Sequence, residues 1–111
     1  MSTRAVDEIW QDWNDAVNMT AEELEDWLET PESRSVGDKS DDEESTGHRS
    51  GRRIVRLLRT KKNELDEDDA AHMRKVVSYV HRHLAQRPDG DVSHTPWRYS
   101  LMNWGHDPLK D

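Results

Sequence analysis

Residues 48–62 read HRSGRRIVRLLRTKK, a stretch with seven Lys or Arg residues and no acid. Successive residues of an α-helix are about 100° apart, so the arginines fall on one side and the aliphatic residues on the other. The arginine side comprises Arg49, Arg52, Arg53, Arg56 and Arg59. The aliphatic side comprises Ile54, Val55, Leu57 and Leu58. The pattern predicts an amphipathic helix whose apolar side needs a core and whose charged side needs an anion.

The segments before this helix predict two more helices. Apolar residues recur at helical spacing in residues 4–18, with acids on the other side. Thr20 and Glu23 form a capping box that starts a short second helix, which Thr30-Pro31 is expected to end. We expect the two helices to pair as an acidic N-terminal helical hairpin.

The segments after the arginine helix predict a long central helix and a short C-terminal one. The central helix is expected over about residues 67–86. Its expected inner face is Met73, Val76, Val77, Val80 and Leu84. The last helix is anchored by tryptophan, with Thr95 as N-cap, Pro96 in the first turn and Gly105 as the stop. Since no stretch alternates with period two, the chain is predicted to be all-α, with four to five helices.

Length and composition favour a single domain over residues 1–111. Residues 32–47 contain almost nothing to bury and are expected to form a mobile acidic loop. The chain contains no cysteine, which excludes a thiolate nucleophile and a Cys-based zinc site. No stretch has the length of a membrane span and the first residues lack a signal-peptide core, so we expect a cytoplasmic protein without a membrane partner.

Charge is unevenly distributed in this acidic chain. The net charge is -8, yet residues 1–47 hold fifteen acids and three bases, and residues 48–62 hold bases only. Arg outnumbers Lys and Asp outnumbers Glu, which is typical of an acidic protein from a salt-adapted host. Alternation of this kind indicates electrostatic matching, either within the fold or with a partner.

The arginine helix is the main candidate site. Its basic side chains suit contacts along the phosphates of a nucleic acid. An equally weighted alternative is that they pair with the chain's own acids, on the N-terminal hairpin or in residues 38–45. Within the site, the Ser50–Gly51 turn suits one phosphate or carboxylate if Ser50 caps the helix, although such a cap is common without any ligand. The candidate residues are Arg49, Ser50, Gly51, Arg52, Arg53, Arg56, Arg59, Lys61 and Lys62.

Other constellations give no chemistry. His81 and His83 lie about 200° apart on a helix, so they cannot share a metal ion. Residues 103–108, NWGHDP, include His106 and Asp107 but offer no serine or cysteine nucleophile, and a helix cap with a turn explains them better. We therefore expect no catalytic residues, no metal and no cofactor.

Four strings carry a resemblance to a known family: VNMTAEELEDWLETPESRSVG, TGHRSGRRIVRLLRTKK, HMRKVVSYVHRHLAQRP and WRYSLMNWGHDPLK. Together they resemble a family of small bacterial, archaeal and fungal proteins catalogued as a domain of unknown function. Its members often carry the automatic label "DNA-binding protein". The resemblance covers nearly the whole chain and implies no catalytic or binding residue.

The expected function is that of a small non-catalytic binding module. Its first-choice ligand is nucleic acid, DNA above all, held through phosphates by the arginine helix. Further bases of the central helix are expected to assist, namely Arg74, Lys75, Arg82 and Arg87. The alternative is a protein-interaction or self-assembly module, in which the acidic helices of one copy, or an acidic protein partner, meet the basic helix. An enzyme acting on a phosphorylated metabolite at Ser50 ranks third.

Overall fold

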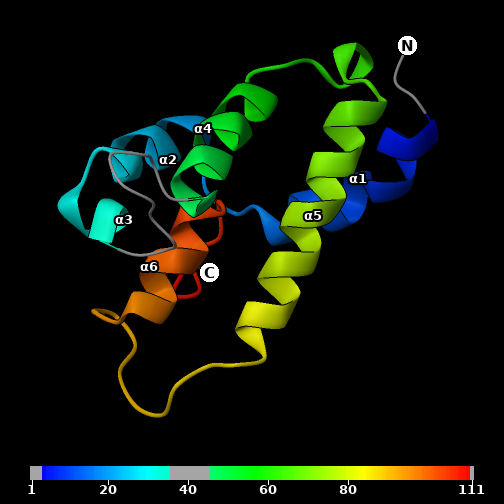
Figure 1. The fold of residues 1–111 in the computed structure, drawn as a ribbon. Helices are drawn as coiled ribbons and strands as arrows, with labels where there is room; N and C mark the ends of the chain where they lie inside the picture. Colours follow the sequence, from blue (N-terminus) through cyan, green and yellow to red (C-terminus); the bar gives the residue numbers. More distant parts are fainter. Residues whose placement is uncertain (1–3, 36–45, 111) are drawn as a thin grey trace.

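The longest helix, α5 (Glu67–Leu84), lies beside the N-terminal helix α1 (Arg4–Ala16) (Figure 1). The computed structural model describes residues 4–35 and 46–110. The remaining elements are α2 (Ala21–Leu28), α3 (Pro31–Ser35), α4 (Thr46–Leu58), the 3-10 helix η1 (Lys62–Glu64) and α6 (Pro96–Asn103). The described residues thus form helices and no strand, which confirms the all-α prediction. None of these helices is long and apolar enough to cross a membrane.

The helices pack as two nested pairs. Helix α1 packs on α5, α2 packs on α4, and α6 contacts α2, α3, α4 and α5 (Figure 1). The predicted N-terminal hairpin is therefore wrong in its pairing, because α1 and α2 each bury their apolar side mainly against a later helix. The physical reason is that a longer apolar side was available on α5 than on the eight-residue α2.

The core forms where these pairs meet α6. The predicted inner residues Met73, Val76, Val77 and Val80 are buried, and Leu84 packs at the edge. Three indoles from two helices anchor it, with Trp13 on α1 and Trp97 and Trp104 at the two ends of α6. A few large aromatic residues therefore supply much of the buried area that a small domain needs.

Helix starts follow the capping signals in two of the three predicted cases. Thr20 and Glu23 exchange both capping-box hydrogen bonds, at 3.1 and 2.8 Å, and Thr95 caps α6 through the amide of Arg98. Ser50 does not cap α4, because that helix begins a turn earlier, at Thr46. The third prediction is therefore wrong.

The segment predicted as an acidic loop, residues 32–47, is helical at both of its ends. Its first residues belong to α3 and its last residues to α4. Helix α3 forms because Thr30 accepts the amide of Ser33 at 3.2 Å and Pro31 suits a first turn. The middle of the predicted loop, residues 36–45, lies outside the described residues.

The side chain of Asn103 links α6 to α2 and α3 through hydrogen bonds. Its buried Oδ1 accepts the indole N–H of Trp27 at 2.8 Å and the hydroxyl of Ser33 at 2.5 Å, while its Nδ2 donates to the Ser33 carbonyl at 3.0 Å. Because an indole can only donate, the amide oxygen must face Trp27. The three bonds join residues that lie 70 or more positions apart in the sequence.

The C-terminal segment forms the helix cap and turn that the sequence predicts. Gly105 adopts φ +82°, and its carbonyl accepts the amide of Met19 at 3.2 Å. Nδ1 of His106 lies 2.7 Å from the Ala16 carbonyl, and Asp107 pairs with Arg98 at 3.1 Å. The motif NWGHDP thus ties the end of the chain to the loop after α1.

Candidate nucleic-acid interface

The predicted site residues divide first by burial. Ser50 and Gly51 lie inside α4 and are buried, whereas Arg49, Arg52 and Arg56 are exposed. The Ser50 hydroxyl lies 3.1 Å from Nε2 of His72 on α5. Ser50 thus contributes to contact between helices, and it does not present its hydroxyl at a helix end.

Gly51 permits close helix packing. A Cβ at this position would lie 2.6 Å from the Asn103 carbonyl oxygen and 2.7 Å from Cδ2 of Leu28. The residue is therefore glycine because α2 and α6 approach the α4 backbone closely. The space that was predicted for a phosphate beside Gly51 is occupied by the protein itself.

Three of the predicted basic residues pair with acids of the same chain. Arg59 reaches Glu25 of α2 at 2.9 Å, Arg53 reaches Asp69 of α5 at 3.6 Å, and Lys62 reaches Asp7 of α1 at 3.2 Å. In Arg59, the hydrogen bond to Glu25 raises the pKa of the guanidinium. Internal pairing, the alternative weighed from the sequence, thus accounts for part of the arginine stripe.

Arg49, Arg56 and Lys61 remain on the surface. None of the three makes an ion pair with another described residue, and all three are exposed. Arg49 and Arg56 lie two turns apart on the same side of α4. They give this side positive charge that no ion pair between described residues offsets.

Arg52 lines a hollow of about 390 Å³ beside α2, α3 and α4. The lining also includes His48, whose Nε2 lies 2.7 Å from the Leu28 carbonyl. The hollow has charged groups of both signs, because its lining contains Glu25 and Glu29 as well as Arg34 and Arg52. Such a lining does not select an anion.

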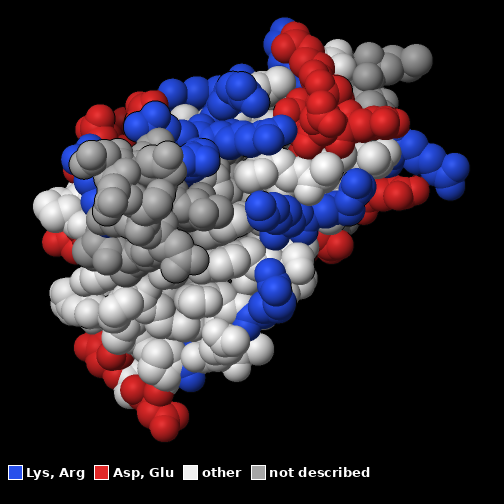
Figure 2. Space-filling view, in the orientation of Figure 1, with Lys and Arg blue, Asp and Glu red and all other residues white. Residues whose placement is uncertain are grey.

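Helix α5 contributes further basic side chains to the face of the molecule that bears the arginines of α4. Lys75 and Arg82 follow His72 and Tyr79 by three residues and therefore lie on the same side of α5. Figure 2 shows Lys and Arg side chains over α4 and along α5 on one face, with uncharged surface between them. The largest group of described acids on this face lies near the N-terminal end of α5, and others lie at its edges. We call this surface the α4–α5 face.

Five rings stack in a column next to this face. The order is His72, Trp104, Tyr79, His83 and Trp97, with neighbouring ring planes 14–15° apart. Tyr79 and Trp104 are closest, at 4.2 Å between centroids, and Arg87 covers Trp97 from 5.5 Å. The flat surfaces of the inner rings are thus occupied by one another.

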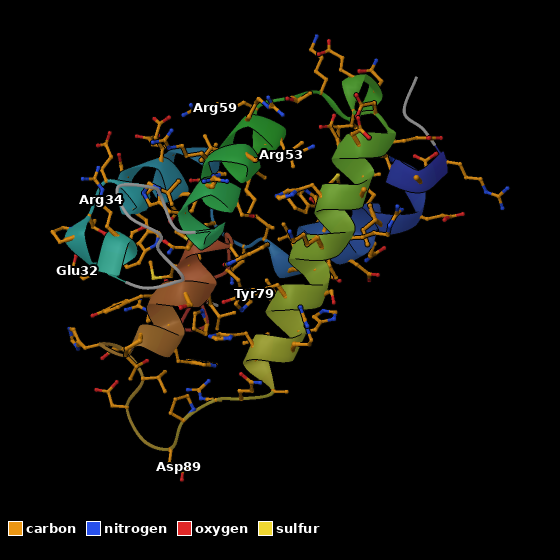
Figure 3. The ribbon with its side chains drawn as sticks, in the orientation of Figure 1. Glu32, Arg34, Arg53, Arg59, Tyr79 and Asp89 are labelled. Carbon is orange, nitrogen blue, oxygen red and sulfur yellow. The ribbon has the colours of Figure 1, made fainter. Side chains whose placement is uncertain are left out.

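His72 stands where the charges of both helices meet. Its pKa is lowered from 6.5 to about 4, mainly by burial and further by the charges of Arg53, Lys75 and Arg56, against the opposing effect of Asp69. The imidazole is therefore neutral at neutral pH. Arg53 projects from α4 toward α5 and also donates to the Asp68 carbonyl at 3.3 Å (Figure 3).

The lowered pKa of His72 predicts a loss of stability in mildly acidic solution. Between pH 6.5 and about 4 the unfolded chain binds a proton that the folded chain does not, so the free energy of unfolding falls across this window. We expect the His72→Gln variant to lose less stability than the wild type between about pH 7 and pH 4.5. Urea unfolding at several pH values measures the difference.

His83 also contributes to the loss of stability in acid. Burial also lowers the pKa of His83, so the variant should keep part of the acid sensitivity. Equal losses of stability in the variant and the wild type would contradict the role of His72.

The sequence predicted no functional role for His72. Its spacing to Lys75 and Tyr79 could have placed all three on one side of α5. The sequence does not predict that Trp104 lies against this side of α5, because the contact of Trp104 with α5 depends on how α6 crosses α5.

The described residues bring no group of three His, Cys, Asp or Glu side chains together as a metal site. The arrangement offers instead exposed cations from α4 and α5 near the neutral imidazole of His72. No curated protein and no solved structure matches the chain. Residues 12–102 match a family described as a protein of unknown function, DUF3140, and the chain therefore belongs to that family.

Proposed function

We propose that this protein binds nucleic acid, DNA in the first place, through phosphate contacts from the α4–α5 face. One observation carries the proposal: exposed bases of α4 and α5 share one face (Figure 2). The exposed bases of these two helices include Arg49 and Arg56 on α4 and Lys75 and Arg82 on α5. Phosphates bind such side chains without regard to sequence, because the attraction comes from counterion release.

The charge of the rest of the molecule supports the same surface. A chain of net charge -8 repels a polyanion in most orientations. The acids Asp7 and Glu25 pair with Lys62 and Arg59 beyond the C-terminal end of α4, and no ion pair between described residues engages Arg49 or Arg56. A nucleic acid would therefore approach with the α4–α5 face foremost.

The aromatic column favours a duplex over a single strand. Proteins that bind single strands without sequence preference offer free ring surfaces on which bases stack. The rings beside the α4–α5 face are stacked on one another, and no described Trp or Tyr is fully exposed. Binding through phosphates alone is stronger for the polymer with the higher charge density, which is the duplex.

Fluorescence anisotropy with a labelled mixed-sequence duplex tests the proposal. We expect the Arg49→Ala/Arg56→Ala variant to bind more weakly at every salt concentration. The slope of log affinity against log salt should fall by about two, because two phosphate contacts are lost. Neither arginine holds an ion pair with a described residue, so the fold should be retained.

The matched control removes two charges elsewhere. Arg4→Ala/Lys110→Ala changes the net charge equally but touches neither α4 nor α5. It should bind the duplex with an unchanged salt slope. Absence of binding by the folded wild type at about 50 mM salt would overturn the proposal. Concentration-dependent mass in light scattering, reversed by salt, would instead favour self-assembly.

A further inference from the structure

The hollow beside α2, α3 and α4 has the size of a small-molecule site. Its volume of about 390 Å³ is at the lower end of the range of such sites, which is about 300–1,000 Å³. Side chains from all three helices line it, and Arg34 extends from α3 beside α2 (Figure 3). A hollow of this size suits a small organic molecule rather than a folded partner.

Two contacts between α2 and α4 determine where the hollow lies. Arg59, just after α4, pairs with Glu25 of α2 at 2.9 Å, and Nε2 of His48 lies 2.7 Å from the Leu28 carbonyl. The later residue of one helix thus meets the earlier residue of the other, so the two helices run antiparallel. Because Glu25, Leu28 and His48 all line the hollow, it extends along α2 from one contact to the other.

The inner part of the described lining is apolar. Leu28 is 5% exposed and Val55 is 8% exposed, and what remains exposed of each contributes to the hollow. Both residues belong to the hydrophobic core, so the hollow reaches the surface of that core. An apolar group placed here would remove this remaining surface from water, which favours binding.

Two residues of opposite charge line the same hollow without a partner in the described part of the chain. Glu29 follows the last residue of α2, and Arg34 lies in α3. Both are exposed, and no ion pair or side-chain hydrogen bond between described residues engages either of them. They do not pair with each other, so each can take a charged group of a ligand.

We propose that this hollow binds a free amino acid with an apolar side chain. The ammonium group would meet Glu29, the carboxylate would meet Arg34, and the side chain would lie against Leu28 and Val55. The acids of the lining disfavour a simple anion and its arginines disfavour a simple cation, so a ligand with both charges matches it best. A guanidinium also matches a carboxylate in shape, because it can donate two parallel hydrogen bonds.

Amide NMR of the full-length chain, labelled with nitrogen-15, tests the site. Valine, leucine, isoleucine and methionine are added separately at about 10 mM, tenfold above a weak Kd of about 1 mM. We expect at least one of them to move the amide signals of Leu28, Glu29 and Val55. The signal of Asp12, on the exposed side of α1, should stay in place. If none of the four moves the signals of the lining residues, the proposal is wrong.

Analogues of the amino acid that binds best test its two charges separately. For leucine they are leucinamide, which lacks the carboxylate, and isocaproate, which lacks the ammonium group. Each should bind about tenfold more weakly than leucine, because one charged contact is lost. Equal binding of all three would overturn the proposal, since the hollow would then recognise the apolar side chain alone.

Two variants assign each charge of the ligand to its residue. Arg34→Gln should weaken the binding of leucine about tenfold and leave that of leucinamide unchanged. Glu29→Gln should weaken leucine in the same way and leave isocaproate unchanged. Asp26→Asn is the matched control, because it removes a charge from α2 outside the described lining. Circular dichroism checks that each variant is folded. A variant that weakens leucine and its one-charge analogue alike would contradict the assigned contact.

This site goes beyond nucleic-acid binding and does not depend on it, because neither Glu29 nor Arg34 lies on α4 or α5. The two proposals therefore fail separately. If the duplex does not bind and an amino acid does, the hollow is a ligand site and the proposed function is wrong. If the duplex binds and no amino acid does, nucleic-acid binding stands and the amino-acid site is wrong.

Discussion

Replacing Gly51 with alanine should destabilise the protein by about 2 kcal/mol, although alanine is the better helix former. Helix propensity alone predicts the opposite, a gain of about 1 kcal/mol. Packing decides the sign, because the new Cβ would lie 2.6 Å from a backbone oxygen of Asn103, which cannot move without moving α6. Urea unfolding followed by circular dichroism measures the change.

The control for this substitution is Ala71→Gly on the exposed side of α5. It isolates propensity and should cost about 1 kcal/mol. A stabilised Gly51→Ala variant would show that α4 is less tightly packed than described. The folded fraction of the variant should bind a duplex with an unchanged salt slope, because Gly51 does not contact the proposed ligand.

The Asn103→Ala variant should lose about 3 kcal/mol of stability. Truncation leaves the part-buried indole N–H of Trp27 and the buried hydroxyl and carbonyl of Ser33 without these partners. Each stranded group costs about 1–3 kcal/mol, partly offset where water can enter. We expect α3 to detach first, since its five residues hold few other contacts.

A double-mutant cycle identifies the source of that loss. Ser33→Ala combined with Asn103→Ala should cost less than the two single changes together, because both changes remove the hydrogen bond from the Ser33 hydroxyl to the Asn103 amide oxygen. Asn14→Ala is the control, since this exposed amide bonds only within α1. Its cost should stay within about 0.5 kcal/mol. If the costs of the two single changes simply added up, the hydrogen bond between Ser33 and Asn103 would not be a source of the loss.

Local signals predicted the helices well because they depend on neighbours in the sequence. The apolar spacing of α5 and the caps at Thr20 and Thr95 describe interactions within a few residues. Thr30-Pro31 shows the limit of such signals. This Thr-Pro pair was interpreted only as the end of α2, whereas it also starts α3, just as Thr95-Pro96 starts α6.

Long-range pairing could not be predicted in the same way. The stripe of arginines was visible in the sequence, but which arginines pair internally depends on where α2 and α5 place Glu25 and Asp69. Ser50 and Gly51 were interpreted as a phosphate-binding turn because the burial of two adjacent residues cannot be predicted from their identities. Their neighbours His72 and Asn103 lie 22 and 52 positions away.

The nested pairing of the helices has a consequence for how the chain folds. Helices α2 and α4 are separated by 17 residues, whereas α1 and α5 are separated by 50. Closing the longer loop costs about 1 kcal/mol more in chain entropy. The α2–α4 pair should therefore assemble early, and α5 should join it late with α1. The two helices of the α4–α5 face would then meet only at the last stage of folding, so partly folded chains would present the arginine helix without α5 beside it.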